Sequence, residues 1–152
     1  MDYEDHARGL GILVSYFHAL EFTLRAVLKN YEKARTKTKI VYSVLKKGDT
    51  VPEDAMTNYD SLGNLIDKYN ELAPKELRIA KGIVAIRDAI AHGRVFSDTQ
   101  NLPMNLFKFD KPKNGAVAVT FAATLDQNWF RDTAVHLYGE IQKVMKTNEK
   151  YA

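Results

Sequence analysis

Cysteine is absent from the 152-residue sequence. Its absence excludes disulfide bonds, zinc ribbons, iron–sulfur clusters and a cysteine nucleophile, and it fits a reducing compartment. The remaining composition, with 45% hydrophobic and 27% charged residues, is ordinary for a globular protein. This length corresponds to one domain, so we expect residues 1–152 to fold as a single unit.

Long apolar runs and a targeting signal are also missing. The first nine residues, MDYEDHARG, are acidic and do not have the pattern of a signal peptide. No apolar run approaches the roughly 18 residues that a membrane helix needs. We therefore expect a cytoplasmic protein with no membrane partner.

The sequence has no large excess of charge of either sign, since its formal net charge is +3. Its charges are nevertheless segregated, because residues 25–47 carry eight bases and one acid, whereas residues 48–76 carry seven acids and two bases. The basic block could follow a phosphate backbone. Charge runs more often mark a solvated helix end, here one neutralised by its acidic neighbour.

Apolar residues at alternating spacings of three and four predict helices over residues 5–34, 60–72, 75–93 and 126–148. Residues 36–47 are ambiguous between a short helix and a loop, and residues 48–59 have the composition of a loop. The first helix has the longest apolar stripe, formed by Leu10, Leu13, Phe17, Leu20, Leu24, Val27 and Tyr31.

A different period follows the third helix. Apolar and polar residues alternate on both sides of Asn114-Gly115, which predicts a β-hairpin with strands near 104–110 and 116–122. An isolated hairpin is marginal in water, so its apolar face, with Phe107 and Phe109, is expected to pack on the helices. The predicted fold is mainly all-α: an antiparallel bundle of four to five helices, with the hairpin (about 104–122) inserted before the last helix.

Most familiar catalytic motifs are missing. The sequence contains no Walker loop and no GxGxxG, and no two of its four histidines have the i,i+4 spacing of a helical metal site. His18 and Glu21 form a lone H-x-x-E, but the core stripes supply none of the further carboxylates that a helical di-metal site requires. We expect neither a metal nor another cofactor.

The segment Ile86-Arg87-Asp88-Ala89-Ile90-Ala91-His92-Gly93-Arg94 stands out chemically. Histidine exchanges protons near neutral pH, and arginine binds phosphate oxygens through two parallel donors, so the pair suits metal-free cleavage of RNA by its own 2′-hydroxyl. On an ideal helix, residues five apart lie about 140° apart around the axis. Convergence would need either a helix that loosens near Gly93 or a two-fold axis that pairs two copies.

This segment resembles the R-x4-6-H motif of the HEPN superfamily, matched by Arg87 and His92. HEPN domains are bundles of four or five mostly antiparallel helices and are usually dimeric, with the motif near the end of the third long helix. The resemblance covers the helical frame, and the hairpin departs from it. It implies a metal-independent endoribonuclease of the kind found among toxins, phage-defence effectors and RNA-processing enzymes.

The resemblance also implies roles and partners. Arg87 and His92 would be catalytic, Asp88 would be the polar residue that follows the motif arginine, and Glu21 would be the acidic residue of the first helix that faces the motif. The implied partners are RNA, a second copy of the chain and an antitoxin protein. We add a set of residues as candidate contacts to nucleic acid: Arg94, Lys29, Lys33, Arg35 and Lys37.

Three other interpretations remain open. Arg87, Asp88 and His92 could serve only the fold, since Asp88 and His92 have the i,i+4 spacing of a surface pair and a cation is favourable at a helix C-terminus. The chain could be an inactive HEPN-like module that binds a nucleotide or a partner protein. The small residues of the third helix could serve only to form an oligomer.

Overall fold

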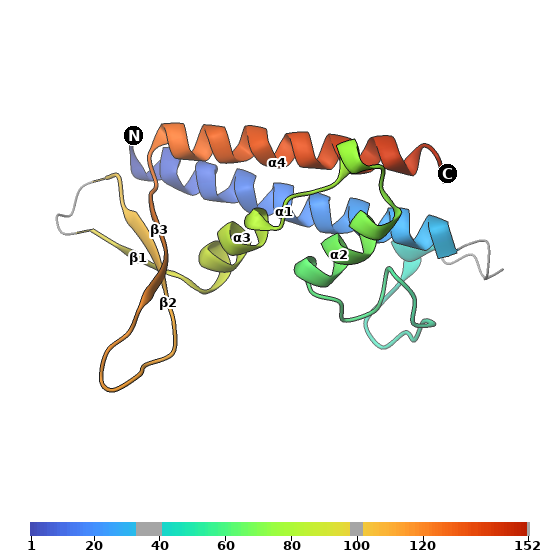
Figure 1. Ribbon diagram of the computed structural model, residues 1–152, viewed down its shortest axis with the longest axis horizontal. Coiled ribbons are helices and arrows are strands. Elements are labelled where there is room, and N and C mark those ends of the chain that lie inside the picture. The colour runs from blue at the N-terminus through green and yellow to red at the C-terminus, as the bar shows by residue number, and fades with distance from the viewer. Residues whose placement is uncertain (33–40, 98–101, 152) are drawn as a thin grey trace. The chain divides into compact units, whose positions relative to one another are not determined.

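The computed structural model describes residues 1–32, 41–97 and 102–151. Within them the protein is mainly helical, with a three-stranded antiparallel sheet before the last helix, so the predicted fold class is confirmed at this level. The long elements, shown in Figure 1, are helices α1 (Tyr3–Glu32), α2 (Leu62–Leu72), α3 (Gly82–His92) and α4 (Gln127–Asn148) and strands β1 (Arg94–Phe96), β2 (Asn105–Phe109) and β3 (Val119–Thr124). Short 3₁₀ helices occupy Tyr42–Val44 and Lys75–Leu77.

Helices α1, α2 and α4 follow the sequence prediction. The middle of the α1 stripe is buried, whereas Leu10 is half-buried and Tyr31 is exposed. Capping sets the other two starts: the Ser61 hydroxyl accepts the Asn64 N–H of α2 at 3.2 Å, and the Asp126 carboxylate accepts the Trp129 N–H of α4 at 2.7 Å. Of the first predicted helix, residues 33 and 34 lie outside the described residues.

The third helix is shorter than predicted. The segment from 75 forms a 3₁₀ turn and then an extended stretch, and α3 begins only at Gly82. Asn70 is the physical reason: its amide donates to the carbonyl of Ile79 and accepts from the Ile79 N–H, both at 2.8 Å. These two bonds occupy the backbone groups that a helix through Ile79 would use.

The hairpin prediction is correct in kind and wrong in part of its detail. β2 and β3 pair antiparallel, and Asn114 and Gly115 adopt φ angles of 53° and 77°, which are the left-handed values that a two-residue hairpin turn requires. β3 ends at Thr124 rather than near residue 122. The prediction missed β1, which pairs with β2 and spans three residues, too few for an alternating pattern to show.

The apolar face of the hairpin is not the face that packs on a helix. Leu106 is buried, and the Lys108 ammonium lies 3.5 Å from the Asp88 carboxylate of α3. Because side chains alternate along a strand, Phe107 and Phe109 lie on the opposite face, where both are partly exposed. The expectation that these two rings pack on the helices is therefore wrong; the buried Leu106 lies against Gly93 at the end of α3 instead.

The chain divides into two compact units, residues 1–19 with 80–140 and residues 20–79 with 141–152. In the first unit, the His6 and Phe130 rings are 5.7 Å apart and the Tyr16 and Tyr138 rings are 6.4 Å apart.

In the second unit, the side-chain amides of Asn30 and Asn148 are hydrogen-bonded at 2.8 Å. In the first unit residue numbers rise together along α1 and α4, since His6 and Tyr16 contact Phe130 and Tyr138 in that order. These helices therefore run parallel there, and the predicted antiparallel packing is wrong for this pair. Short connections favour antiparallel neighbours, but α1 and α4 are separated by every other element.

One helix meets the length and composition of a membrane span. α1 contains an apolar window of 18 residues, of which 28% is buried in the protein. The expectation that no segment approaches this length is therefore too strong. Core helices of globular proteins and signal sequences satisfy the same test, so α1 does not identify a membrane protein.

Candidate functional site at the end of α3

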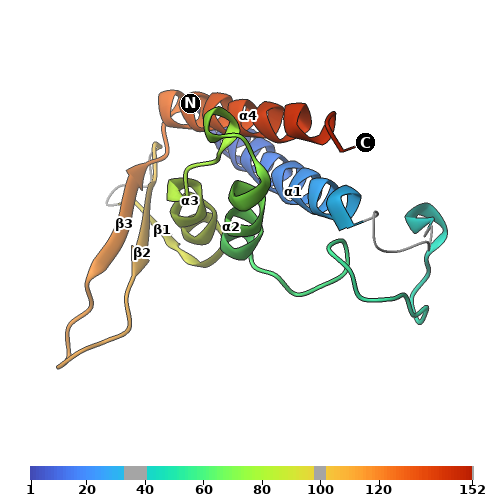
Figure 2. The same ribbon diagram turned by 45° about the vertical axis from the view of Figure 1, so that its right-hand side comes forward.

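Gly93 ends α3, and β1 begins at the next residue. Figure 2 shows the chain passing from α3 into β1. The Gly93 N–H donates to the Ala89 carbonyl at 2.7 Å, so α3 keeps its hydrogen bonding to the end. A Cβ at Gly93 would lie 2.3 Å from the Ala89 oxygen and 2.9 Å from the Phe107 oxygen, which only glycine avoids. The close approach fixes the end of α3 against β2, and the helix does not loosen there.

Arg87 is held by its neighbour. Its guanidinium lies 3.0 Å from one oxygen of Asp88, and the Lys108 ammonium lies 3.5 Å from the other. The Arg87 side chain remains 40% exposed. Asp88 thus orients Arg87 and, through Lys108, links α3 to β2. The sequence did not indicate Lys108, whose only signal was its place in the alternating pattern of β2.

The exposed side of α3 contains both motif residues. Ala85, Ala91 and His92 are exposed, whereas Ile83 and Ala89 are buried. With 100° per residue, the three exposed positions fall within about 120° of the helix surface, and the two buried positions lie on the remaining arc.

On this helix, Arg87 and His92 lie at the two margins of the exposed side, with Asp88 between them. In one chain the two motif side chains therefore point about 140° apart and do not converge.

His92 opens into a pocket of about 230 Å³ at the junction of α3 and the sheet. Arg94 lines the same pocket, and its guanidinium lies 5.9 Å from the centre of the Phe109 ring. The structure therefore brings His92 and Arg94 together. The full lining is His92, Arg94, Phe96, Phe109, Asp110, Pro112 and Val117.

Glu21 belongs to the second unit and has a partner there. Its carboxylate accepts from the Arg25 guanidinium at 3.0 and 3.1 Å. The other guanidinium donors bind the carbonyls of Ala55, Asn58 and Asp60, at 3.0 to 3.2 Å. Glu21 thus orients an arginine, but that arginine is Arg25, which fastens the loop before α2 onto α1.

Lys29 is also engaged within the second unit. It pairs with Asp54, and both side chains are largely buried. The hydrogen bond with Asp54 raises the pKa of Lys29. Burial alone would raise the pKa of Asp54, but hydrogen bonds from Lys29 and from the Met56 N–H outweigh it and lower that pKa.

The basic block is therefore engaged in the fold at Lys29. The remaining candidate contacts in this block, Lys33, Arg35 and Lys37, lie outside the described residues.

Metal ligands do not gather in the part of the chain that the structure describes, where no group of three or more histidine, aspartate or glutamate side chains could hold an ion. Comparison of the chain with family models, with curated proteins and with solved structures finds no match in any of the three. The function is therefore inferred from the residues of the chain and their geometry.

Proposed function

We propose that the protein is a metal-independent endoribonuclease of HEPN type, in which His92 transfers protons and Arg87 binds the reacting phosphate. One observation carries the proposal: a solvent-open histidine shares its pocket with Arg94 and lies on the same exposed helix side as an arginine held by a carboxylate. A HEPN-like bundle of the four helices belongs to the same proposal.

The reaction needs only groups that this chain and RNA supply. The 2′-oxygen attacks phosphorus as its proton is removed, and the 5′-oxygen leaves as it gains a proton. The products are a 2′,3′-cyclic phosphate and a 5′-hydroxyl. His92 carries out one of the two proton transfers, and Arg87 stabilises the negative charge that builds up on the phosphate.

The proposal includes a two-fold homodimer. Because Arg87 and His92 point about 140° apart on one helix, a single chain does not place both on one phosphate. A two-fold axis along the exposed side of α3 would place Arg87 of one protomer beside the partner's copy of this helix. The cleft would then take its arginine and its histidine from different protomers.

The test is cleavage of labelled RNA in the presence of EDTA. We expect His92→Ala to lower the rate by about 10²–10⁴ and Arg87→Ala to lower it by about 10²–10³. His136→Ala, at an exposed histidine of α4, is the matched control for His92. Arg131→Ala is the control for Arg87, because Arg131 pairs with Asp132 at 3.0 Å as Arg87 pairs with Asp88.

The outcomes separate catalysis from binding. Cyclic phosphate ends that appear with wild type and both controls, and that are lost in both folded motif variants, support the proposal. Equal cleavage by all five proteins, or cleavage abolished by EDTA, would refute the assigned roles. The alternative is then a catalytically inactive HEPN-like module that binds a nucleotide or a partner protein through the same pocket.

A toxin or phage-defence effector is the biological role that this chemistry would serve, with an antitoxin protein as a further partner and the cytoplasm as its place of action. Such an enzyme must be kept inactive until cleavage of the cell's RNA is needed. An inhibitor that covers the exposed side of α3 would block Arg87 and His92 together.

A further inference from the structure

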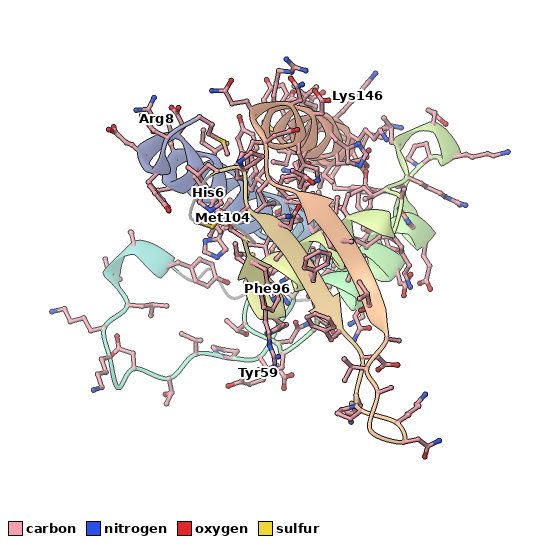
Figure 3. All side chains as sticks on the ribbon, turned by 90° about the vertical axis from the view of Figure 1, so that its left-hand side faces the viewer. His6, Arg8, Tyr59, Phe96, Met104 and Lys146 are labelled. Carbon is pink, nitrogen blue, oxygen red and sulfur yellow. The ribbon has the colours of Figure 1, made fainter. Side chains whose placement is uncertain are left out.

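Three phenylalanine rings gather on the sheet face opposite Leu106 and Lys108. Phe96 comes from β1, and Phe107 and Phe109 come from β2; their ring centres are 6.0, 6.2 and 6.3 Å apart. We call this group the aromatic face. Phe96 is 45% exposed, and Phe107 and Phe109 are partly exposed. Figure 3 shows Phe96 beside the strands.

The exposure of these rings is not required by the sheet. On the other face of β2, Lys108 pairs with Asp88 of α3, and the buried Leu106 lies against Gly93 at the end of α3. Cross-strand ring contacts stabilise a sheet, but they do not require three large apolar side chains on the side facing solvent. An exposed apolar cluster that includes aromatic rings is typical of a binding surface.

Cations surround the aromatic face. The register pairs Arg94 with Phe107, so Arg94 lies on the same face, and its guanidinium is 5.9 Å from the Phe109 ring centre. His92 opens into the adjoining pocket, where Asp110 is the one acidic side chain among the described lining residues. Lys111 and Lys113 follow on the exposed hairpin arm. Aromatic rings flanked by cations suit a ligand with flat bases, which stack on the rings, and phosphates, which bind the cations.

We propose that the aromatic face binds single-stranded RNA, with bases stacked on Phe96, Phe107 and Phe109 and a phosphate held by Arg94. Stacking on aromatic side chains selects unpaired bases, because a duplex keeps its bases stacked on one another. The inference rests on the proposed function for its substrate class and assigns the surface that seats it. A strand on this face would pass the pocket into which His92 opens.

The experiment measures binding separately from cleavage. Fluorescence anisotropy of a short labelled oligouridine is recorded with His92→Ala protein, which leaves the RNA intact. Phe96→Leu and Phe109→Leu, added to this background, keep an apolar side chain and remove the π-face. We expect each to weaken binding by about tenfold. Phe22→Leu is the matched control, because Phe22 is 59% exposed on α1 and outside the aromatic face.

Two further measurements test the phosphate contact of Arg94 and the preference for single-stranded over double-stranded RNA. Arg94→Ala should lower the steepness with which affinity falls with salt, because one phosphate contact is lost. A duplex of the same length should bind more weakly than the single strand. Unchanged affinity in both folded phenylalanine variants, or tighter binding of the duplex, would overturn the inference. A change in oligomeric state in those variants without RNA would overturn it in favour of a contact between copies.

The two proposals fail separately. Tight binding that depends on Phe96 and Phe109, without cleavage by wild-type protein, would refute only the nuclease. Cleavage that depends on His92 but has the same KM in Phe96→Leu and wild type would refute only the aromatic face.

Discussion

His6 and His92 occupy opposite environments in the first unit. His6 is buried, its ring packs edge-on against Phe130, and its Nδ1 has no hydrogen-bond partner among the described residues. Burial disfavours the charged ring and lowers the pKa of His6 from its ordinary value of 6.5. His92 instead opens into a solvent-accessible pocket beside Arg94. Of these two histidines, His92 is the one that a bound ligand can reach.

The buried histidine should make the fold sensitive to acid. A histidine whose pKa is lower in the folded state than in the unfolded state costs no stability above the unfolded-state pKa of 6.5, because the ring is then neutral in both states. As pH falls below that value, the unfolded state binds the proton first and stability declines. His6→Leu should therefore reduce the drop in Tm between about pH 7.5 and about pH 5.5. One such group can lower the free energy of unfolding by up to about 1.4 kcal/mol per pH unit.

Differential scanning calorimetry at both pH values measures this change. His136→Leu, at an exposed histidine, should show the same acid-induced drop in Tm as wild type. An undiminished drop in His6→Leu would assign the acid sensitivity to other groups.

At the scale of elements, α1 contains two glycines in different surroundings. A Cβ at Gly9 would lie 2.6 Å from the Phe130 ring of α4, whereas a Cβ at Gly11 would meet nothing within 4 Å. Glycine lowers helix stability at both positions, since it loses more backbone entropy than alanine. At Gly9 this cost allows the two helices to approach closely.

The two glycines should respond to alanine with opposite signs. Gly9→Ala forces the ring of Phe130 to move and should destabilise the protein by about 1–3 kcal/mol. Gly11→Ala should stabilise it by about 0.5–1 kcal/mol through helix propensity alone. Urea denaturation of both variants and wild type measures the difference, and a stabilised Gly9→Ala would show that α1 and α4 do not pack as described.

The predictability of each element depends on where its causes lie in the chain. The long helices were predictable because a stripe such as that of α1 is a local pattern, and the cap of α4 lies in Asp126 itself. The start of α3 was not predictable, because it depends on Asn70, which lies nine residues before Ile79. The Asn70 side chain binds the Ile79 backbone and keeps Ile79 out of the helix. The prediction missed β1 because this strand forms by pairing with β2 and not from a local sequence pattern.

The candidate site divides in the same way. Arg87, Asp88 and His92 were identifiable because their chemistry and spacing lie in one short segment. The pocket was not, because it depends on which face of β2 packs on α3, and the alternation of β2 fits either choice until Leu106 is placed. The partner of Glu21 was likewise out of reach, since Arg25 gains its other hydrogen bonds from residues 30 to 35 positions away.

At the scale of the whole molecule, the exposed side of α3 is where two copies would meet. Ala85 and Ala91 are exposed there and leave little side chain between a neighbouring helix and the α3 backbone. Ala85 lies seven residues before His92 and hence on nearly the same side of the helix. A dimer through this side would bring both motif residues to the boundary between the protomers.

A large charged side chain at Ala85 should therefore separate the proposed dimer. We expect Ala85→Arg to convert the protein to a monomer in light scattering and to lose RNA cleavage while His92 is still present. Val135→Arg is the control, because Val135 is 66% exposed on α4. A dimer that dissociates in Val135→Arg but not in Ala85→Arg would move the interface to α4.

A mixture of Arg87→Ala and His92→Ala chains should regain part of the activity, since a mixed dimer contains one cleft with both an intact arginine and an intact histidine. If the two variants form mixed dimers and the mixture is still inactive, each active site lies within a single protomer.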